Sequence, residues 1–206
     1  MRITRLLFIA LLAVSLHGCA EKGPILLAVS YQEPAEITPA SSRLTVGVSQ
    51  FKDVRGKAAS VLGKRTIPGG PENDFVVQGT VAGVATTSLK KALTARGFSV
   101  KDVPWDLTAE GMKSDGSALL LGGEIKTLWL ESTSDTLKTH LRATVQMRVV
   151  AGDPLEKKIV RSVEVSSRLE QDLLYSREEL EDALSEALTS AIDQIFRDED
   201  LKKRLQ

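Results

Sequence analysis

Few residues of this chain could carry out chemistry. Among its 206 residues the sequence has two histidines, His17 and His140, and one cysteine, Cys19. A zinc site needs at least about three converging ligands, and His140 has no second ligand at a metal-binding spacing. A Ser-His-Asp site would depend on the same histidine, without a Gly-x-Ser-x-Gly turn nearby to present the serine. The sequence therefore predicts no metal, no cofactor and no catalytic residue, and we expect His140 to be solvated.

Two glycine-lysine pairs raise the question of a phosphate-binding loop. The pairs are Gly56-Lys57 and Gly63-Lys64, and Arg65 follows the second pair. A phosphate-binding loop has a shorter fixed spacing between its first glycine and its Gly-Lys pair, and Ser or Thr follows that pair directly. Both conditions fail here, so nucleotide binding by this stretch is not expected.

The amino-terminal segment has the layout of an export signal. Arg2 and Arg5 precede an apolar run from Leu6 to Leu16, and the first acidic residue is Glu21. The run is about 11 residues long, roughly half of the ~20 that span the hydrocarbon core of a bilayer as a helix. The pattern favours an export signal over a permanent transmembrane helix.

The end of this run, Leu16-His17-Gly18-Cys19, resembles the lipobox of bacterial lipoproteins. The resemblance implies cleavage before Cys19, lipid attachment to its thiol and, with Ala20 in the next position, delivery to the outer membrane. Two or three acyl chains on one residue hold a protein on a membrane almost permanently. We therefore expect a signal peptide over 1–18, a lipidated cysteine and tether over 19–42, and a periplasm-facing domain over 43–206. Within the tether, the apolar patch from Ile25 to Val29 either adds an edge strand to the domain or lies along its surface.

The charge balance argues against a nucleic-acid partner. Of the 27 basic residues, Arg2 and Arg5 fall in the expected signal, which leaves 25 against 27 acidic residues. Nucleic-acid binders usually concentrate Lys and Arg on one surface, and this chain has no dense basic run. The single thiol also excludes a disulfide within the chain.

Hydrophobic periodicity predicts the elements of the domain. Apolar residues alternate in 43–51, 137–149 and 159–165, as in half-buried strands, and 119–130 reads as a strand with a bulge or bend at Gly122-Gly123. The stretch 52–74 is rich in glycine and proline and is expected to be a long loop. Residues 119–167 form an antiparallel meander on this interpretation.

Two helices complete the expected fold. Apolar residues recur at spacings of three and four over 75–96, until Gly97, and again over 176–196, where Ser176 and Glu179 match a capping box. The acidic cluster at this second start favours the helix dipole; it comprises Glu178, Glu179, Glu181 and Asp182. We expect an α/β (α+β) fold, with a single mixed, mostly antiparallel sheet and two helices packed on one face.

The two tryptophans have different expected roles. Trp129 lies late in a strand and is expected in the core. Trp105 follows Pro104 and is either an exposed anchor for a partner, as exposed tryptophans often are, or packed over a sheet edge.

Three segments resemble the YajG-like family of bacterial lipoproteins. They are Val46-Gly47-Val48-Ser49-Gln50-Phe51-Lys52-Asp53-Val54-Arg55, the helix end Ala95-Arg96-Gly97-Phe98-Ser99-Val100, and the long final helix. The family implies a cell-envelope lipoprotein without established chemistry. We take Phe51, Asp53, Arg55 and Trp105 as candidate partner contacts.

Three functional hypotheses follow. The first is a non-enzymatic outer-membrane lipoprotein that acts as a binding or assembly accessory for an envelope protein partner, through the 52–74 loop and exposed sheet edges. The second is an auxiliary lipoprotein of an envelope transport system, which would need an apolar cavity between sheet and helices for a lipid or another apolar ligand. The third, an envelope hydrolase, would need a cleft that joins His140 to a serine and a carboxylate.

Overall fold

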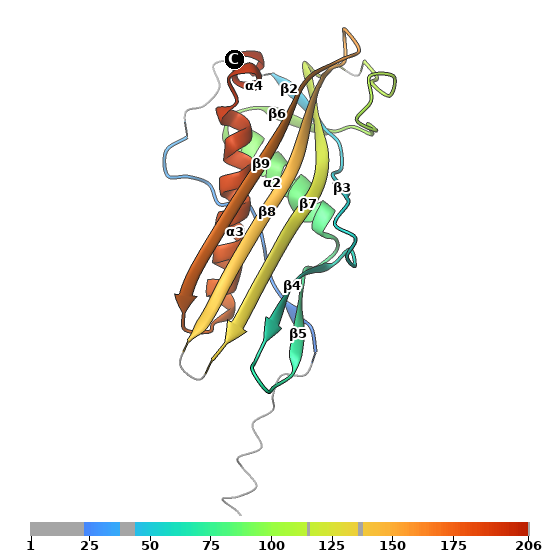
Figure 1. The fold of residues 1–206 in the computed structure, drawn as a ribbon. Helices are drawn as coiled ribbons and strands as arrows, with labels where there is room; N and C mark the ends of the chain where they lie inside the picture. Colours follow the sequence, from blue (N-terminus) through green and yellow to red (C-terminus); the bar gives the residue numbers. More distant parts are fainter. Residues whose placement is uncertain (1–22, 38–43, 115, 136–137, 206) are drawn as a thin grey trace, which may run out of the picture.

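The computed structural model describes residues 23–37, 44–114, 116–135 and 138–205. In these residues one mixed sheet of nine strands carries three helices (Figure 1). In chain order the elements are β1 Ile25–Leu26, β2 Thr45–Val48, β3 Lys52–Asp53, β4 Val61–Thr66, β5 Glu72–Val76, α2 Val81–Ala95, β6 Ser99–Asp102, β7 Leu119–Ser134, β8 Thr139–Asp153, β9 Lys158–Leu173, α3 Arg177–Arg197 and α4 Glu199–Arg204.

Strand β7 organises the sheet. Along one edge it pairs antiparallel with β8, which pairs antiparallel with β9. Along the other edge it pairs in parallel with β2, β3 and β4 in turn. The sheet continues from β2 to β6 at one end, and from β4 through β5 to β1 at the other. The expected antiparallel meander is therefore confirmed, and three short parallel strands are added to its edge.

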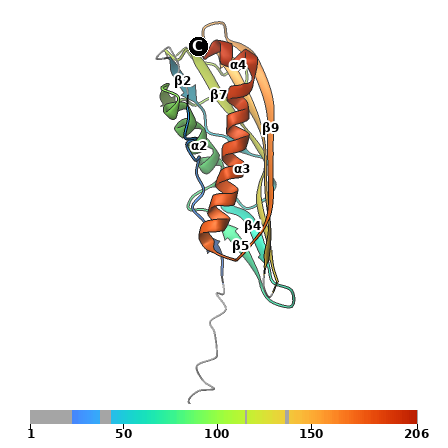
Figure 2. The same ribbon diagram turned by 90° about the vertical axis from the view of Figure 1, so that its left-hand side faces the viewer.

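Both long helices lie on the same side of the sheet (Figure 2). Leu141, Val145 and Met147 of β8 point toward them and are at most 1% exposed, and they pack with Leu89 of α2 and Leu188 of α3 in one core. The expected mixed α/β fold is confirmed. The short helix α4 was not expected.

Local signals set the helix ends. The Ser176 side chain accepts a hydrogen bond from the Glu179 amide at 3.1 Å and begins α3, and Thr80 accepts one from the Gly83 amide at 3.0 Å and begins α2. Gly97 follows α2 with φ +87°, a left-handed conformation that costs glycine little. The helix ends near Gly97 as the sequence predicts.

The expected long loop over 52–74 was wrong. It contains β3 and most of a hairpin made by β4 and β5, whose turn is closed by a hydrogen bond of 2.8 Å from the Gly70 amide to the Ile67 carbonyl. Asn73 and Phe75 are buried on either side of the exposed Asp74, which is a strand pattern. The first helix consequently begins at Val81 and not near residue 75.

The expected bulge at Gly122-Gly123 lies elsewhere. Both glycines keep regular pairing with β8, and the register shifts between Ile125 and Thr127. A Cβ atom on Gly123 would lie 2.3 Å from the carbonyl oxygen of Arg148 and 2.7 Å from the Phe51 ring. Glycine at this position therefore allows the β8 main chain and the Phe51 ring to lie close to β7.

Candidate functional site

Arg55 and Asp53 form a buried ion pair at the edge of β7. The Arg55 guanidinium lies 2.8 Å from the Asp53 carboxylate, with the two side chains 3% and 17% exposed. It also donates to the carbonyl oxygens of Val61 at 2.8 Å and Leu128 at 3.1 Å. Hydrogen bonds from Arg55 hold the pKa of the Asp53 carboxyl below its ordinary value. The pair fills the gap that β7 leaves between β3 and β4.

The other two candidate contacts are buried aromatic rings. Phe51 is 3% exposed in the main core, and Trp105 is 7% exposed in a second cluster on the opposite face of the sheet, with Met112 and Leu120. The Trp105 indole nitrogen donates to the Thr108 carbonyl at 2.7 Å. Of the two alternatives for Trp105, the structure has the packed one.

Trp129, expected in the core, is instead half-buried on the outer face of the sheet. The ammonium nitrogen of Lys57 lies 5.3 Å from the centre of its ring. Both residues line a hollow of about 350 Å³ that Lys64, Lys126 and Arg55 also border. Lys64 and Lys126 are paired with Glu72 and Glu164, so most of this positive charge is already compensated.

His140 lies on the outer face of β8. Its Nδ1 is 3.0 Å from an Asp172 carboxylate oxygen, and both side chains are more than half exposed. A hydrolytic triad would need a positioned nucleophile within hydrogen-bond reach, whereas this pair is one of several charge pairs across β7, β8 and β9. Within the described part of the chain, no three His, Cys, Asp or Glu side chains converge on a metal site.

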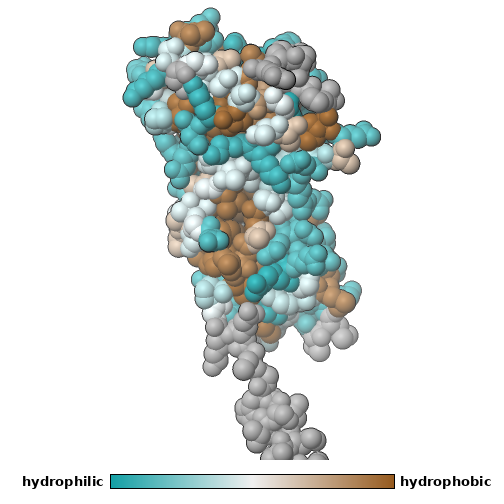
Figure 3. Space-filling view, turned by 180° about the vertical axis from the view of Figure 1, so that it is seen from behind, coloured by the Kyte–Doolittle hydropathy of each residue, from teal (hydrophilic) through white to brown (hydrophobic). Residues whose placement is uncertain are grey.

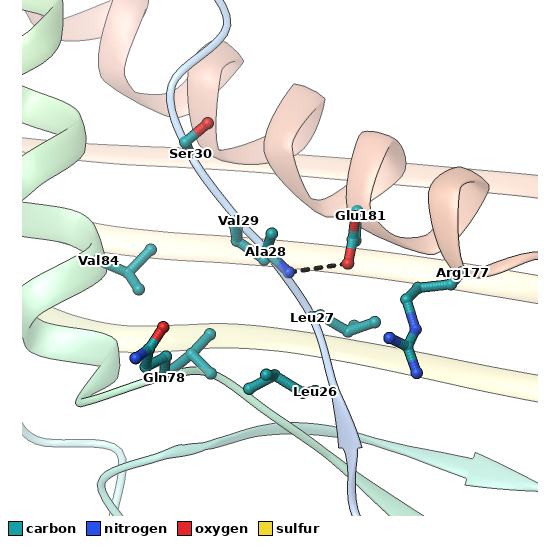
Figure 4. Close-up of a pocket in the computed structure, with 10 residues that line it drawn as sticks. Leu26, Leu27, Ala28, Val29, Ser30, Gln78, Val84, Arg177 and Glu181 are labelled. Atoms are coloured by element: carbon teal, nitrogen blue, oxygen red, sulfur yellow. Dashed lines mark hydrogen bonds between the residues drawn. The ribbon is translucent and has the colours of Figure 1, made fainter.

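Residues 23–32, within the segment expected as a tether, lie against the domain. β1 pairs with β5, and the chain then runs extended along α3 (Figure 4). The amides of Ala28 and Gln32 donate to Glu181 at 2.9 Å and to Thr189 at 2.8 Å. Part of the acidic cluster at the start of α3 therefore holds this segment, a role that sequence reasoning missed.

Tyr31 fixes the far end of the segment. Its side chain is 0% exposed, its hydroxyl donates to Asp193 at 2.9 Å, and Arg96 donates to the same hydroxyl at 2.9 Å. Arg96 and Asp193 are themselves paired at 2.8 Å. Burial raises the pKa of the Tyr31 phenol. The only sequence signal for this contact was an aromatic residue within a proline-rich stretch.

An open groove lies between this segment and α2. It comprises two adjoining hollows of about 410 and 470 Å³, which share Val29, Ser30, Gln78 and Val84. Leu26, 49% exposed, and Val77 extend its apolar floor, while Arg177, Glu181 and Lys91 stand at its borders. Seen from the helix side, hydrophobic residues form a patch near the middle of this face, with hydrophilic residues around it (Figure 3). Figure 4 shows Val29 and Val84 on facing sides of the groove.

The expected lipid attachment site lies outside the described residues. Cys19 and the lipobox residues Leu16, His17 and Gly18 all precede residue 23, where the description begins. Among the residues that are described, no helix combines the length and apolar character needed to cross a bilayer.

These features define an α/β domain with a packed core and an open apolar groove on its helix face. A family model described as an uncharacterized lipoprotein matches residues 52–206, which is most of the chain. The protein belongs to this lipoprotein family, and lipoproteins are membrane-anchored. No curated protein matches the sequence significantly.

Comparison with solved structures finds similar bacterial proteins. The protein XCC0632 from Xanthomonas campestris superposes with a TM-score of 0.53 at 12% identity, over 84% of this chain and 90% of that chain. A minor lipoprotein from Acinetobacter baumannii has a TM-score of 0.40 at 15% identity, over 78% of this chain and 95% of its own. The lipoprotein GNA1162 from Neisseria meningitidis has a TM-score of 0.34 at 15% identity, over 75% and 99%. The likeness to XCC0632, at 12% identity, shows a shared fold.

Proposed function

We propose that the protein is a non-enzymatic, YajG-like lipoprotein of the outer membrane, anchored by lipid on Cys19 and facing the periplasm. It serves as a binding or assembly accessory for another envelope protein. The observation that carries this proposal is the open apolar groove between residues 26–31 and α2.

The groove has the anatomy of a protein contact surface. Leu26, Val29 and Val84 supply an aliphatic floor, and polar or charged side chains border it. Interfaces commonly combine an apolar centre with a polar rim, and contiguous apolar surface on a soluble domain usually marks a partner site. The occupant that fits is an apolar segment of an envelope protein, a few of whose side chains would fill the two hollows.

The packing between sheet and helices weighs against a lipid carrier. That space is filled by side chains such as Leu89, Leu130 and Leu188, each 0% exposed. A carrier would enclose most of its ligand's apolar surface, whereas this groove is open to solvent. The auxiliary transport role for a lipid or another apolar ligand is therefore the second candidate.

Photocrosslinking in living cells tests the groove. A photoreactive amino acid replaces Val84 in the groove or, as the control, Thr144 on the outer face of the sheet; both are partly exposed. We expect one discrete protein adduct from position 84 and none from position 144. An adduct of lipid mass at position 84 would favour the transport role. Equal labelling at both positions would contradict the groove as the partner-binding site.

Intact-mass analysis tests the anchor separately. The wild-type protein is expected to lack residues 1–18, to carry acyl mass and to fractionate with the outer membrane, whereas Cys19→Ala is expected to do none of these. A wild-type protein with its first residues intact and no acyl mass would contradict the anchor.

A further inference from the structure

The start of the described chain is fixed at one end of the molecule. The Asn73 side-chain amide donates to the Gly23 carbonyl at 2.9 Å, and the Leu27 amide donates to the Val76 carbonyl at 2.8 Å. Ile25 between them is 2% exposed. Gly23 therefore lies beside residue 73 of β5, near the tip of the β4–β5 hairpin.

The distance from this point to the expected anchor is short. Four residue steps separate Cys19 from Gly23, and an extended chain covers at most about 14 Å in four steps. The hairpin runs on from Asn73 to its tip at Gly70, which is about 10 Å at the rise of a strand. If lipid holds Cys19 in a bilayer, little space is left between that bilayer and the hairpin tip.

Three turns meet at this end. They are the tip of the β4–β5 hairpin, the turn that begins where β7 ends at Ser134, and the β9–α3 turn. Figure 1 shows the ends of these strands together at the lower end of the molecule. The Arg65 guanidinium of β4 lies 3.6 Å from the centre of the Tyr175 ring in the β9–α3 turn, and its Nε donates to Ser134 of β7 at 3.4 Å. Arg65 thus joins the turns into one surface.

The tips of the β4–β5 hairpin and of the β9–α3 turn are uncharged, whereas the end of β7 beside them has the exposed Asp135 and Lys138 of opposite charge. The hairpin turn reads Ile67-Pro68-Gly69-Gly70-Pro71, and the β9–α3 turn reads Leu173-Leu174-Tyr175. Leu174 is 79% exposed. Tyrosine and arginine, with apolar bodies and polar ends, suit the boundary between lipid and water. Exposed acidic residues flank the tips, Glu72 beside the hairpin and Glu178 at the start of α3, so contact through the tips requires no anionic lipid.

We propose that this end of the domain, formed by residues 67–71 and 173–175, rests on the bilayer that carries the anchor. The inference depends on the lipid anchor of the proposed function. The long strands then stand away from the membrane, and at about 3.3 Å per residue the 15 residues of β8 place the β8–β9 turn roughly 50 Å from it. The opposite end, with Leu155 and α4, projects into the periplasm.

Two exposed leucines provide a matched test. Leu174 is 79% exposed at the proposed membrane end, and Leu155 is 77% exposed in the β8–β9 turn at the opposite end. Leu174→Cys and Leu155→Cys each place one free thiol in the lipidated protein, because its single native cysteine carries lipid. Each purified variant is labelled with a fluorophore and reconstituted in phosphatidylcholine vesicles that contain a lipid with a nitroxide headgroup.

We expect several-fold stronger quenching of the fluorophore at position 174 than at position 155, without anionic lipid. Equal quenching at both positions, or stronger quenching at 155, would overturn the orientation while leaving the anchor intact. The intact mass of the same samples reports on the anchor: absence of acyl mass on Cys19 would contradict the anchor and this inference together.

Discussion

Arg55 and Asp53, two residues apart in sequence, place a buried guanidinium in the gap between β3 and β4, where that edge of β7 has no strand beside it. The contact of 2.8 Å between them orients Arg55 toward the carbonyl oxygens of Val61 and Leu128. A side chain thus satisfies main-chain acceptors that a longer β3 or β4 would otherwise satisfy. The motif that suggested partner contact is therefore part of what holds the sheet edge together.

Removal of Arg55 is expected to destabilise the domain strongly. Arg55→Ala leaves two carbonyl groups without their donor and a largely buried carboxylate without its counter-charge, with only the main-chain amide of residue 55 still donating to it; the expected cost is about 3–5 kcal/mol in the free energy of unfolding. Urea unfolding followed by circular dichroism measures this change. Arg148→Ala is the control, because Arg148 is 44% exposed and lies 3.8 Å from Glu124, and an exposed pair contributes less than about 1 kcal/mol. Equal losses of stability in the two variants would show that the contacts of Arg55 contribute no more than an exposed ion pair does.

Acid is expected to weaken this pair in a defined pH window. The folded state lowers the pKa of Asp53 from its ordinary value of 3.8, chiefly through hydrogen bonds from Arg55. Because the lowered pKa belongs to the folded state, the stabilisation is complete above about pH 5 and is lost as the pH falls through the folded-state pKa. The difference in unfolding free energy between wild type and Asp53→Asn should shrink as the pH falls below about 5 toward the folded-state pKa of Asp53. If this difference in unfolding free energy stays constant as the pH falls, titration of Asp53 does not contribute to it.

The Tyr31 hydroxyl is expected to control how tightly residues 26–32 hold to the helices. Tyr31→Phe keeps the ring and removes the hydrogen bonds to Asp193 and Arg96, at a cost of about 0.5–1.5 kcal/mol, because these two residues remain paired with each other. Hydrogen exchange read by mass spectrometry should become faster in residues 26–32 and stay unchanged in β8. If Tyr31→Phe leaves exchange of the segment unaltered, other contacts hold it.

The two tryptophans are expected to differ in fluorescence. Trp105→Phe leaves the half-buried Trp129 beside Lys57, and Trp129→Phe leaves the 7% exposed Trp105. Emission at longer wavelength and stronger quenching by acrylamide are therefore expected for Trp105→Phe. The reverse order would contradict the placement of Trp129 on the outer face.

Much of the fold could be predicted because local physics dictates it. The alternation in β8 follows from a strand that is buried on one face, and the start of α3 follows from Ser176 capping exposed amides. The stripe of leucine and isoleucine along α3 required a sheet to cover, which the structure supplies. Each of these signals lies within a few residues of the element that it specifies.

The candidate site could be predicted much less well. The hairpin of β4 and β5 was expected to be a loop because its glycines and prolines dominate its composition, while its strand pairing depends on β7 and β1. Trp129 was expected in the core, yet it falls on the polar face of β7, where Lys57 covers it. The segment that forms one wall of the groove looked like a tether, because its partners Glu181 and Asp193 lie more than 150 residues away.

The sequence by itself determined the strand meander, the two long helices and the pattern of an exported lipoprotein, because periodicity, capping and a signal are read along the chain. Tertiary structure alone decided that Arg55 closes a sheet edge, that residues 26–31 and α2 form a groove, and that Leu174 and Leu155 stand at opposite ends. These features arise from contacts between distant segments, and their energies depend on which backbone groups and side chains folding leaves without a partner.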